Sequence, residues 1–402
     1  MWRRYGDVAF ATVFAVAVSL EAIPLAILTW TLAARLFGDH GPARFGSVLL
    51  AAVGSAAAAL LILTTYVLSY QHLSDRRVRL VGERRQVWVA RWLRVLDGAD
   101  PEPNGPLERP AVDALVVLSE TLRGERSTRI AELLERYDAV VRLRREAVHG
   151  RAAGRLDAIA ALSSARVPSA LPTLIEAVRD PNLAVSVAAA RAAARTLARI
   201  DDVVGRVRGA MDLVVAAEAG RLPYGVLEEV VVLSEDSASS VIDALLMSAS
   251  RRPAALRAAL DGIGRLQLLV FAEEVVPYLL HPDLEVRAAA LRAVNRLGFL
   301  PPSSRGIVVT ALHDPVDFIR IHATAAARLL PRPQAVSLLT HALGDRSWWV
   351  RRAAADALVA LGPGGLAQLG EAARDHPDRF ARDMAAQALR DHVPTLVRAV
   401  VG

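Results

Sequence analysis

The chain of 402 residues contains neither cysteine nor lysine. Without cysteine it can form no disulfide, no thiolate metal site and no covalent intermediate on a thiol, and this fits a domain in the cytosol. The sequence also lacks the H-E-x-x-H spacing, a serine, histidine and aspartate grouping, a phosphate-binding loop and a dinucleotide glycine fingerprint. We therefore expect no catalytic residue, no bound metal and no cofactor. The absence of lysine we attribute to genomic composition.

Two long apolar segments occupy the N-terminal region. Residues 8–37 and 46–70 each exceed the roughly 20 apolar residues that a membrane-spanning helix needs, so we predict a transmembrane hairpin over residues 1–70. A cleaved signal peptide is the alternative for the first segment, but its apolar core would be only about 7–15 residues long. The loop between the segments carries only Arg44, whereas many arginines come after the second. The positive-inside rule then places both termini in the cytoplasm.

Glu21 falls near the middle of the first predicted span, where a charged side chain costs about 2.5–3.5 kcal/mol to insert. One interpretation is a polar contact with another membrane subunit, helped by Pro24, which loosens the backbone one turn later. The other is a protonated carboxyl group that bonds within the hairpin, to Ser55, Thr64 or Thr65. We favour the partner contact because two helices shelter a carboxylate poorly.

Positive charge is concentrated after the second span. Residues 72–98 hold seven arginines and three acidic residues, which gives +4 of the total net charge of +6. Such a cluster beside a membrane typically binds anionic lipid head groups. The remainder is nearly balanced and shows no basic stripe, so nucleic acid is not a favoured partner. The candidate lipid-binding residues are Arg76, Arg77, Arg79, Arg84, Arg85, Arg91 and Arg94.

Residues 71–98 read as an amphipathic juxtamembrane helix with Val81, Trp88, Trp92 and Val95 on one face. This face suits a bilayer surface, and it equally suits packing on the first helices of the next domain. Residues 99–110 contain four prolines in twelve positions and are interpreted as a linker.

From residue 111 to residue 402 one pattern recurs. HPDLEVRAAALRAVNRLG begins at His281, and variants begin at Asp180, His313, Gly344 and His376. The aligned arginines Arg287, Arg320, Arg351 and Arg382 succeed one another at intervals of 33, 31 and 31 residues. Helical segments that repeat at this period predict an all-α solenoid of roughly eight helix pairs, in which each pair needs a neighbour to bury its apolar face.

The repeated string of Asp-Pro, Val-Arg and an alanine-rich helix resembles HEAT repeats of the short bacterial, phycobilisome-lyase-like type, well over residues 150–402 and weakly over 111–150. The resemblance implies that the turn aspartate and the helix arginine join neighbouring repeats. It assigns a structural role to Asp314, Asp345, Arg287, Arg320, Arg351 and Arg382. HEAT-like lyases, hydroxylases and DNA glycosylases exist, but the His-Glu pairs of the hydroxylases are missing here.

Two columns of the repeat alignment could carry function. His281, His313 and His376 recur before the repeat helices, and we interpret them as turn residues rather than metal ligands because no ligand spacing accompanies them. The second column holds Ala184 and Glu285, and then Phe318, Trp349 and Phe380. These three aromatic residues would form an exposed ridge that binds a partner. The alternative is that the last repeats bury them.

These features together predict a non-enzymatic, membrane-anchored scaffold in the inner membrane of a bacterium, whose cytoplasmic solenoid recruits or regulates a partner protein. An integral membrane enzyme or complex is the expected partner, and a polysaccharide-synthesising glycosyltransferase is suggested by analogy alone. Anionic lipids are further expected partners, and self-association is compatible with this interpretation. The alternatives are a HEAT-fold enzyme, either a lyase or a nucleic-acid glycosylase, and a sensor of anionic lipids.

Overall fold

The computed structural model describes residues 82–122, 124–248 and 252–401, together with the isolated positions Thr31, Gly54, Ala58, Ile62, Thr65 and Tyr66. Within these residues the regular structure is entirely helical, and no strand occurs. The chain divides into two compact units. The first comprises Met1–Asn104 and Glu108–Ala114, and the second comprises Gly105–Leu107 and Leu115–Gly402.

The predicted membrane segments, 8–37 and 46–70, lie outside the described residues apart from the isolated positions. Glu21, Pro24, Arg76, Arg77 and Arg79 also lie outside them. No helix within the described residues is both long enough and apolar enough to cross a bilayer. The hairpin therefore stays a prediction.

The first unit contains the juxtamembrane helix, whose described part runs from residue 82 to residue 96. Trp92 is fully buried in this unit, and its indole Nε1 donates a hydrogen bond to the carbonyl oxygen of Ala111, 3.0 Å away in helix α3 (Arg109–Thr121). Trp88 lies against it, with 5.8 Å between the ring centres. Of the two interpretations of this tryptophan face, packing against the neighbouring helices therefore holds for Trp92.

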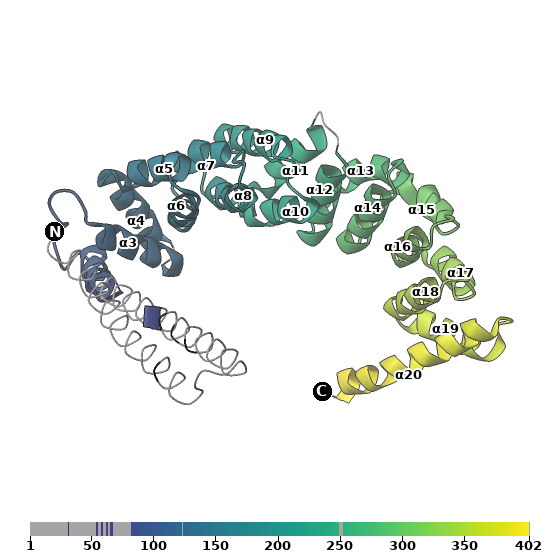
Figure 1. The fold of residues 1–402 in the computed structure, drawn as a ribbon. Helices are drawn as coiled ribbons and strands as arrows, with labels where there is room; N and C mark the ends of the chain where they lie inside the picture. Colours follow the sequence, from purple (N-terminus) through teal and green to yellow (C-terminus); the bar gives the residue numbers. More distant parts are fainter. Residues whose placement is uncertain are drawn as a thin grey trace, which may run out of the picture. The chain divides into compact units, whose positions relative to one another are not determined.

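The second unit is a row of helix pairs. After α4 (Glu125–Arg136), odd-numbered and even-numbered helices alternate between two layers, and each even helix packs on the even helices before and after it (Figure 1). The pairs are α5 (Ala139–His149) with α6 (Ala152–Ala165), α7 (Leu171–Ala177) with α8 (Leu183–Leu197), α9 (Val203–Ala219) with α10 (Tyr224–Leu233), α11 (Ala238–Met247) with α12 (Pro253–Arg265), α13 (Ala272–Val275) and the 3-10 turn Val276–Leu280 with α14 (Leu284–Leu297), α15 (Arg305–Ala311) with α16 (Asp317–Ala327), α17 (Arg332–Ala342) with α18 (Trp348–Ala360), and α19 (Pro363–Asp375) with α20 (Arg379–Val401).

The repeated string determines where helix α14 begins, which face it buries and where it ends. In α14, the Asp283 carboxylate accepts hydrogen bonds from the backbone N–H groups of Glu285 and Val286, at 3.0 and 3.1 Å, and so caps the first turn. Gly298 ends the helix in the left-handed region, at φ 67°, which glycine adopts without strain. Alanines fill the buried face because an even helix is covered on several sides and only small side chains fit.

Arginines of three even helices connect a helix pair to the next one, an arrangement that we name the arginine ladder. Arg155 pairs with Asp180 at 2.9 Å, and Arg287 with Asp314 at 3.5 Å. Arg320 makes a bidentate contact with Asp345, with both N–O distances 2.9 Å. Each of these arginines also donates to backbone carbonyls of the turn before its own helix.

The turn residue six positions before a ladder arginine can pair with the ladder arginine of the preceding repeat. Its residue type determines whether that ion pair forms. In two repeats this residue is an aspartate, Asp314 or Asp345, whose Oδ1 accepts from the backbone N–H two residues later, at 2.8 or 2.7 Å. His281 and His376 make the same turn through Nδ1, at 3.1 Å, to Asp283 and Asp378. Both residue types therefore hold the turn, but only the aspartate offers a carboxylate to the preceding arginine.

Arg351 illustrates the effect of a histidine in the next turn. Its Nη1 donates to the carbonyl of Asp345 at 2.8 Å, as the other ladder arginines do in their own turns. Its Nε is buried and has no hydrogen-bond partner among the described residues, and its guanidinium lies 5.3 Å from the centre of the Phe380 ring. Arg382 likewise donates to turn carbonyls, those of His376 and Pro377, at 2.6 and 3.0 Å.

Candidate protein-binding surface

Aromatic side chains mark the first turns of three successive even helices. Phe318, Trp349 and Phe380 are the second residues of α16, α18 and α20. Trp349 is 64% exposed and Phe380 is 60% exposed, whereas Phe318 is half-buried. The same position in α8 and α14 holds Ala184 and Glu285, which are exposed as well. The first turn of an even helix therefore presents this position to solvent wherever it recurs, with Phe318 the least exposed.

The structure adds Trp348, the first residue of α18, which the repeat alignment did not single out. Its ring meets that of Trp349 edge to face, with 4.7 Å between the centres, and it is also exposed. We name Phe318, Trp348, Trp349 and Phe380 the aromatic ridge. Its rings offer a large apolar area, and Arg351 beneath Phe380 adds a cation. Exposed tryptophan beside arginine is typical of residues that dominate the affinity of protein interfaces.

The predicted lipid-binding arginines that the structure describes have different surroundings. Arg84 and Arg85 are exposed. Arg91 lies over the Trp88 ring at 4.9 Å, and Arg94 forms an ion pair with Asp100 at 2.7 Å. Arg84 and Arg85 are thus the described members of this set that keep an uncovered charge.

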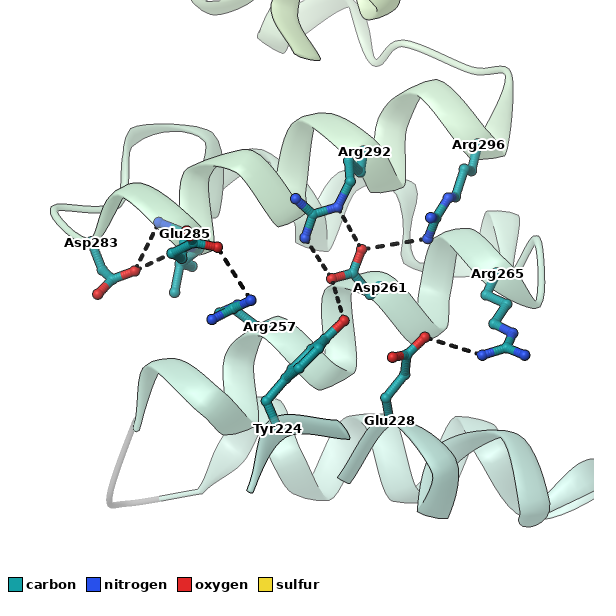
Figure 2. Close-up of polar contacts among 10 residues, drawn as sticks. Tyr224, Glu228, Arg257, Asp261, Arg265, Asp283, Glu285, Arg292 and Arg296 are labelled. Carbon is teal, nitrogen blue, oxygen red and sulfur yellow. Dashed lines mark hydrogen bonds and ion pairs between the residues drawn. The ribbon is translucent and has the colours of Figure 1, made fainter. Parts of the chain in front are cut away.

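A buried polar cluster on the even helices escaped the sequence analysis (Figure 2). Asp261 of α12 is only 2% exposed, and it is the one buried carboxylate among the described residues. Arg292 of α14 makes a bidentate contact with it, at 2.9 and 2.7 Å, and Arg296 approaches at 3.4 Å. The Tyr224 hydroxyl of α10 donates to the second carboxylate oxygen at 3.0 Å. The cluster thus joins α10, α12 and α14.

The electrostatics of this cluster favour one charge state. Hydrogen bonding to Asp261 raises the pKa of Arg292, although burial opposes it. Burial, together with Asp261 and Glu228, raises the pKa of Tyr224, which stays a neutral donor. Burial and the neighbouring Arg292 lower the pKa of His322 to about 4, so this imidazole is neutral at pH 7. Both oxygens of the Asp261 carboxylate thus accept hydrogen bonds from side chains of neighbouring helices.

Two of the recurring histidines, His313 and His376, lie near each other. Together with His341, Asp345 and Asp378 they line a pocket of about 330 Å³. The His376 Nδ1 is engaged in its turn, and Asp345 is engaged with Arg320. In the described part of the chain, no group of three or more histidine, aspartate or glutamate residues is arranged to hold a metal ion.

Part of the chain matches a family of known proteins. Residues 308–390 match the family described as HEAT repeats. No curated protein matches the chain in sequence. Among solved structures, the chain is similar to an engineered protein, with 16% identity and a TM-score of 0.30, covering 70% of this chain and 94% of that one.

Two further similar structures are human deoxyhypusine hydroxylase in complex with glycerol and the Escherichia coli protein YibA. The hydroxylase has 18% identity and a TM-score of 0.25, over 66% of this chain and 98% of its own. YibA has 14% identity and a TM-score of 0.31, over 75% of this chain and 93% of its own. The described helices form an all-helical solenoid of stacked pairs, and residues 308–390 of it match HEAT repeats.

Proposed function

We propose that this protein is a membrane-anchored scaffold whose solenoid binds a partner protein through the aromatic ridge. The observation that carries the proposal is the exposure of Trp348, Trp349 and Phe380 in successive repeats. Large aromatic side chains are mostly interior in soluble proteins, so an exposed row of them indicates an interface. The scaffold acts by holding its partner rather than by catalysis.

The anchor in this proposal is the hairpin predicted over residues 1–70. The basic residues that come after it, among them Arg84 and Arg85, would sit at anionic lipid head groups on the cytoplasmic side of a bacterial inner membrane. The partner is an integral membrane enzyme or complex, which Glu21 would contact within the bilayer. A protein anchored in this way meets its partner in two dimensions, so even a modest affinity at the ridge suffices.

The test compares two sets of substitutions in the full-length protein, purified from native membranes in a mild detergent. The first set changes Phe318, Trp348, Trp349 and Phe380 to alanine together. The control set changes Leu269, Val270 and Phe299, which are exposed apolar residues outside the ridge. We expect the first set to remove a stoichiometric co-purifying membrane protein and the control set to retain it. Far-ultraviolet circular dichroism should be unchanged in both.

Two outcomes would contradict the proposal. Retention of the partner by the folded ridge variant would exclude the ridge as its binding site. Loss of folding in that variant, with intact folding in the control, would show that the ridge residues serve the core. A Glu21→Leu variant separates the second contact, because it should weaken co-purification while the ridge remains unchanged.

A further inference from the structure

Helix α9 leaves an apolar side uncovered. Val204 is 70% exposed and Val215 is 59% exposed, and Val207 and Met211 between them are also exposed. The opposite side of α9 is buried against its neighbours through Leu213, Val214 and Ala217, among others. A run of exposed apolar side chains along one helix, 17 residues or about 25 Å long, indicates an interaction surface. It is separate from the aromatic ridge, which lies on α16, α18 and α20.

The spacing of these residues suits a partner helix. Val204, Arg208, Met211 and Val215 occur at alternating intervals of four and three residues, the pattern of a helix seam that packs on another helix. Arg208 and Asp212 are exposed on this side, and neither makes an ion pair or a hydrogen bond with a described side chain. Helix α9 therefore presents a positive and a negative charge four residues apart on this face.

These two charges specify the occupant. We propose that α9 is a homodimer contact in which two copies of the chain pack α9 against α9 in antiparallel orientation. When the pair is centred at the level of Ala210, residues equally distant from that level lie opposite each other. Arg208 then faces Asp212 of the second copy, and twofold symmetry repeats the contact. A parallel pair would oppose like charges, which is unfavourable.

The groove beside α9 fits the same arrangement. A pocket of about 350 Å³ lies between α7 and α9 and is lined by Leu171, Pro172, Ile175 and Gly205, among others. In the antiparallel pair, Val215 of the second copy lies opposite Gly205, one of the residues that line this pocket. The alignment that pairs the charges thus also brings an exposed apolar side chain to a pocket whose lining combines apolar residues with Arg179, Arg208 and Asp212. A membrane surface is a poorer occupant, because Asp201 and Asp212 are exposed here and anionic lipids would repel them.

The full-length chain permits a direct test because it has no cysteine. The Met211→Cys variant, in mild detergent, is treated with a short bismaleimide and analysed by denaturing electrophoresis. Val270→Cys is the control, since Val270 is 77% exposed and lies outside α9. We expect a covalent dimer with Met211→Cys at a rate at least about tenfold above the control. Equal rates would overturn the proposal, because contact through any other part of the chain would not favour residue 211.

Charge reversal tests the orientation. Arg208→Asp and Asp212→Arg each place like charges opposite each other, so each should raise the dimer dissociation constant by about tenfold, as measured by analytical ultracentrifugation. The double variant restores opposite charges and should return the constant to within about threefold of the parent value. A double variant as weak as the single variants would exclude the antiparallel pairing. Circular dichroism on all four proteins establishes that folding is unchanged.

Discussion

Asp261 illustrates how a single ionisable residue can join three helices. Its carboxylate receives hydrogen bonds from α10 and α14, so the charge is removed from water but is not isolated. The free energy of such a group depends on its partners being present, because an unpaired buried charge is far more costly than a paired one. Arg292 is only 23% exposed in its side chain and faces the same requirement.

We predict that Asp261→Asn lowers the free energy of unfolding by about 3 kcal/mol, because it leaves the Arg292 guanidinium without a counter-charge. Tyr224→Phe removes only a neutral donor and should cost about 1 kcal/mol. Urea unfolding of the full-length protein in mild detergent, monitored by circular dichroism, measures both. Equal effects of the two substitutions would show that the ion pair adds nothing beyond its hydrogen bonds.

The sequence could not have predicted this cluster. Its partners lie 37 and 31 residues away, on other helices, and the residues around Asp261 carry no motif. Local patterns predict which residues begin and line a helix, but not which side chain of a later helix will meet them. Trp348 escaped for a different reason, because the repeat column that was aligned passes through its neighbour, Trp349.

At the scale of the helix pair, the arginine ladder connects consecutive repeats at three places, through Arg155, Arg287 and Arg320. Arg320 is the most buried of these arginines, and its hydrogen bonds to Asp345 raise its pKa. Burial is the largest single influence and would raise the pKa of Asp345, but the hydrogen bonds from Arg320 and from the backbone of Ser347, with the nearby arginine charges, together lower it. Both groups are therefore charged at neutral pH, and the pair contributes its full interaction there.

We predict that His376→Asp stabilises the contact between α18 and α20. The new carboxylate should accept from the backbone of Asp378, as Asp345 does in its own turn, and give Arg351 the partner that its Nε lacks. The expected gain in unfolding free energy is about 0.5–1 kcal/mol, measured by urea unfolding. His376→Asn keeps the turn acceptor without the charge, so it should change stability little. A gain of equal size with asparagine would assign the effect to the turn.

The helix pairs and the contacts between them were the easiest features to predict from the sequence, because the sequence repeats. The aligned copies predicted the helix pairs, and the resemblance to HEAT repeats implied that Asp and Arg connect them, as Arg320 and Asp345 do here. Arg155 was missed because its helix, RAAGRLDAIAALSSA, departs from the repeated string, although it pairs with Asp180 at 2.9 Å. Whether the juxtamembrane tryptophans face lipid or protein required the contact between Trp92 and Ala111.

At the scale of the whole molecule, the predicted membrane topology can be tested by cysteine labelling. We expect Gly41→Cys, in the loop between the predicted spans, to react with a membrane-impermeant maleimide in intact spheroplasts. Val270→Cys in the solenoid should react only after permeabilisation, because the positive-inside rule places the solenoid in the cytoplasm. The absence of any other cysteine makes each label specific. Labelling of Val270→Cys in intact spheroplasts would contradict this orientation.

Architecture was predictable at this scale, because periodic helices at repeat spacing have few alternatives to a solenoid. The interaction surfaces were less accessible. The exposed side of α9 reads in sequence as an ordinary valine-rich core helix, and only burial distinguishes Val204 and Val215 from Leu213 and Val214. Neither the sequence nor the exposed surfaces identify the partner, since its identity depends on the complementary surface of another chain.

Stacking of each pair on its immediate neighbours also bears on how the chain is made. The contacts that join repeats link residues close in sequence, 25 apart for Arg320 and Asp345 and 37 apart for Tyr224 and Asp261. Chains with such local contacts fold rapidly, and a growing chain can begin before its end exists. A helix pair can therefore bury its apolar face as soon as the next pair has left the ribosome, so that little apolar surface is exposed at any moment of synthesis.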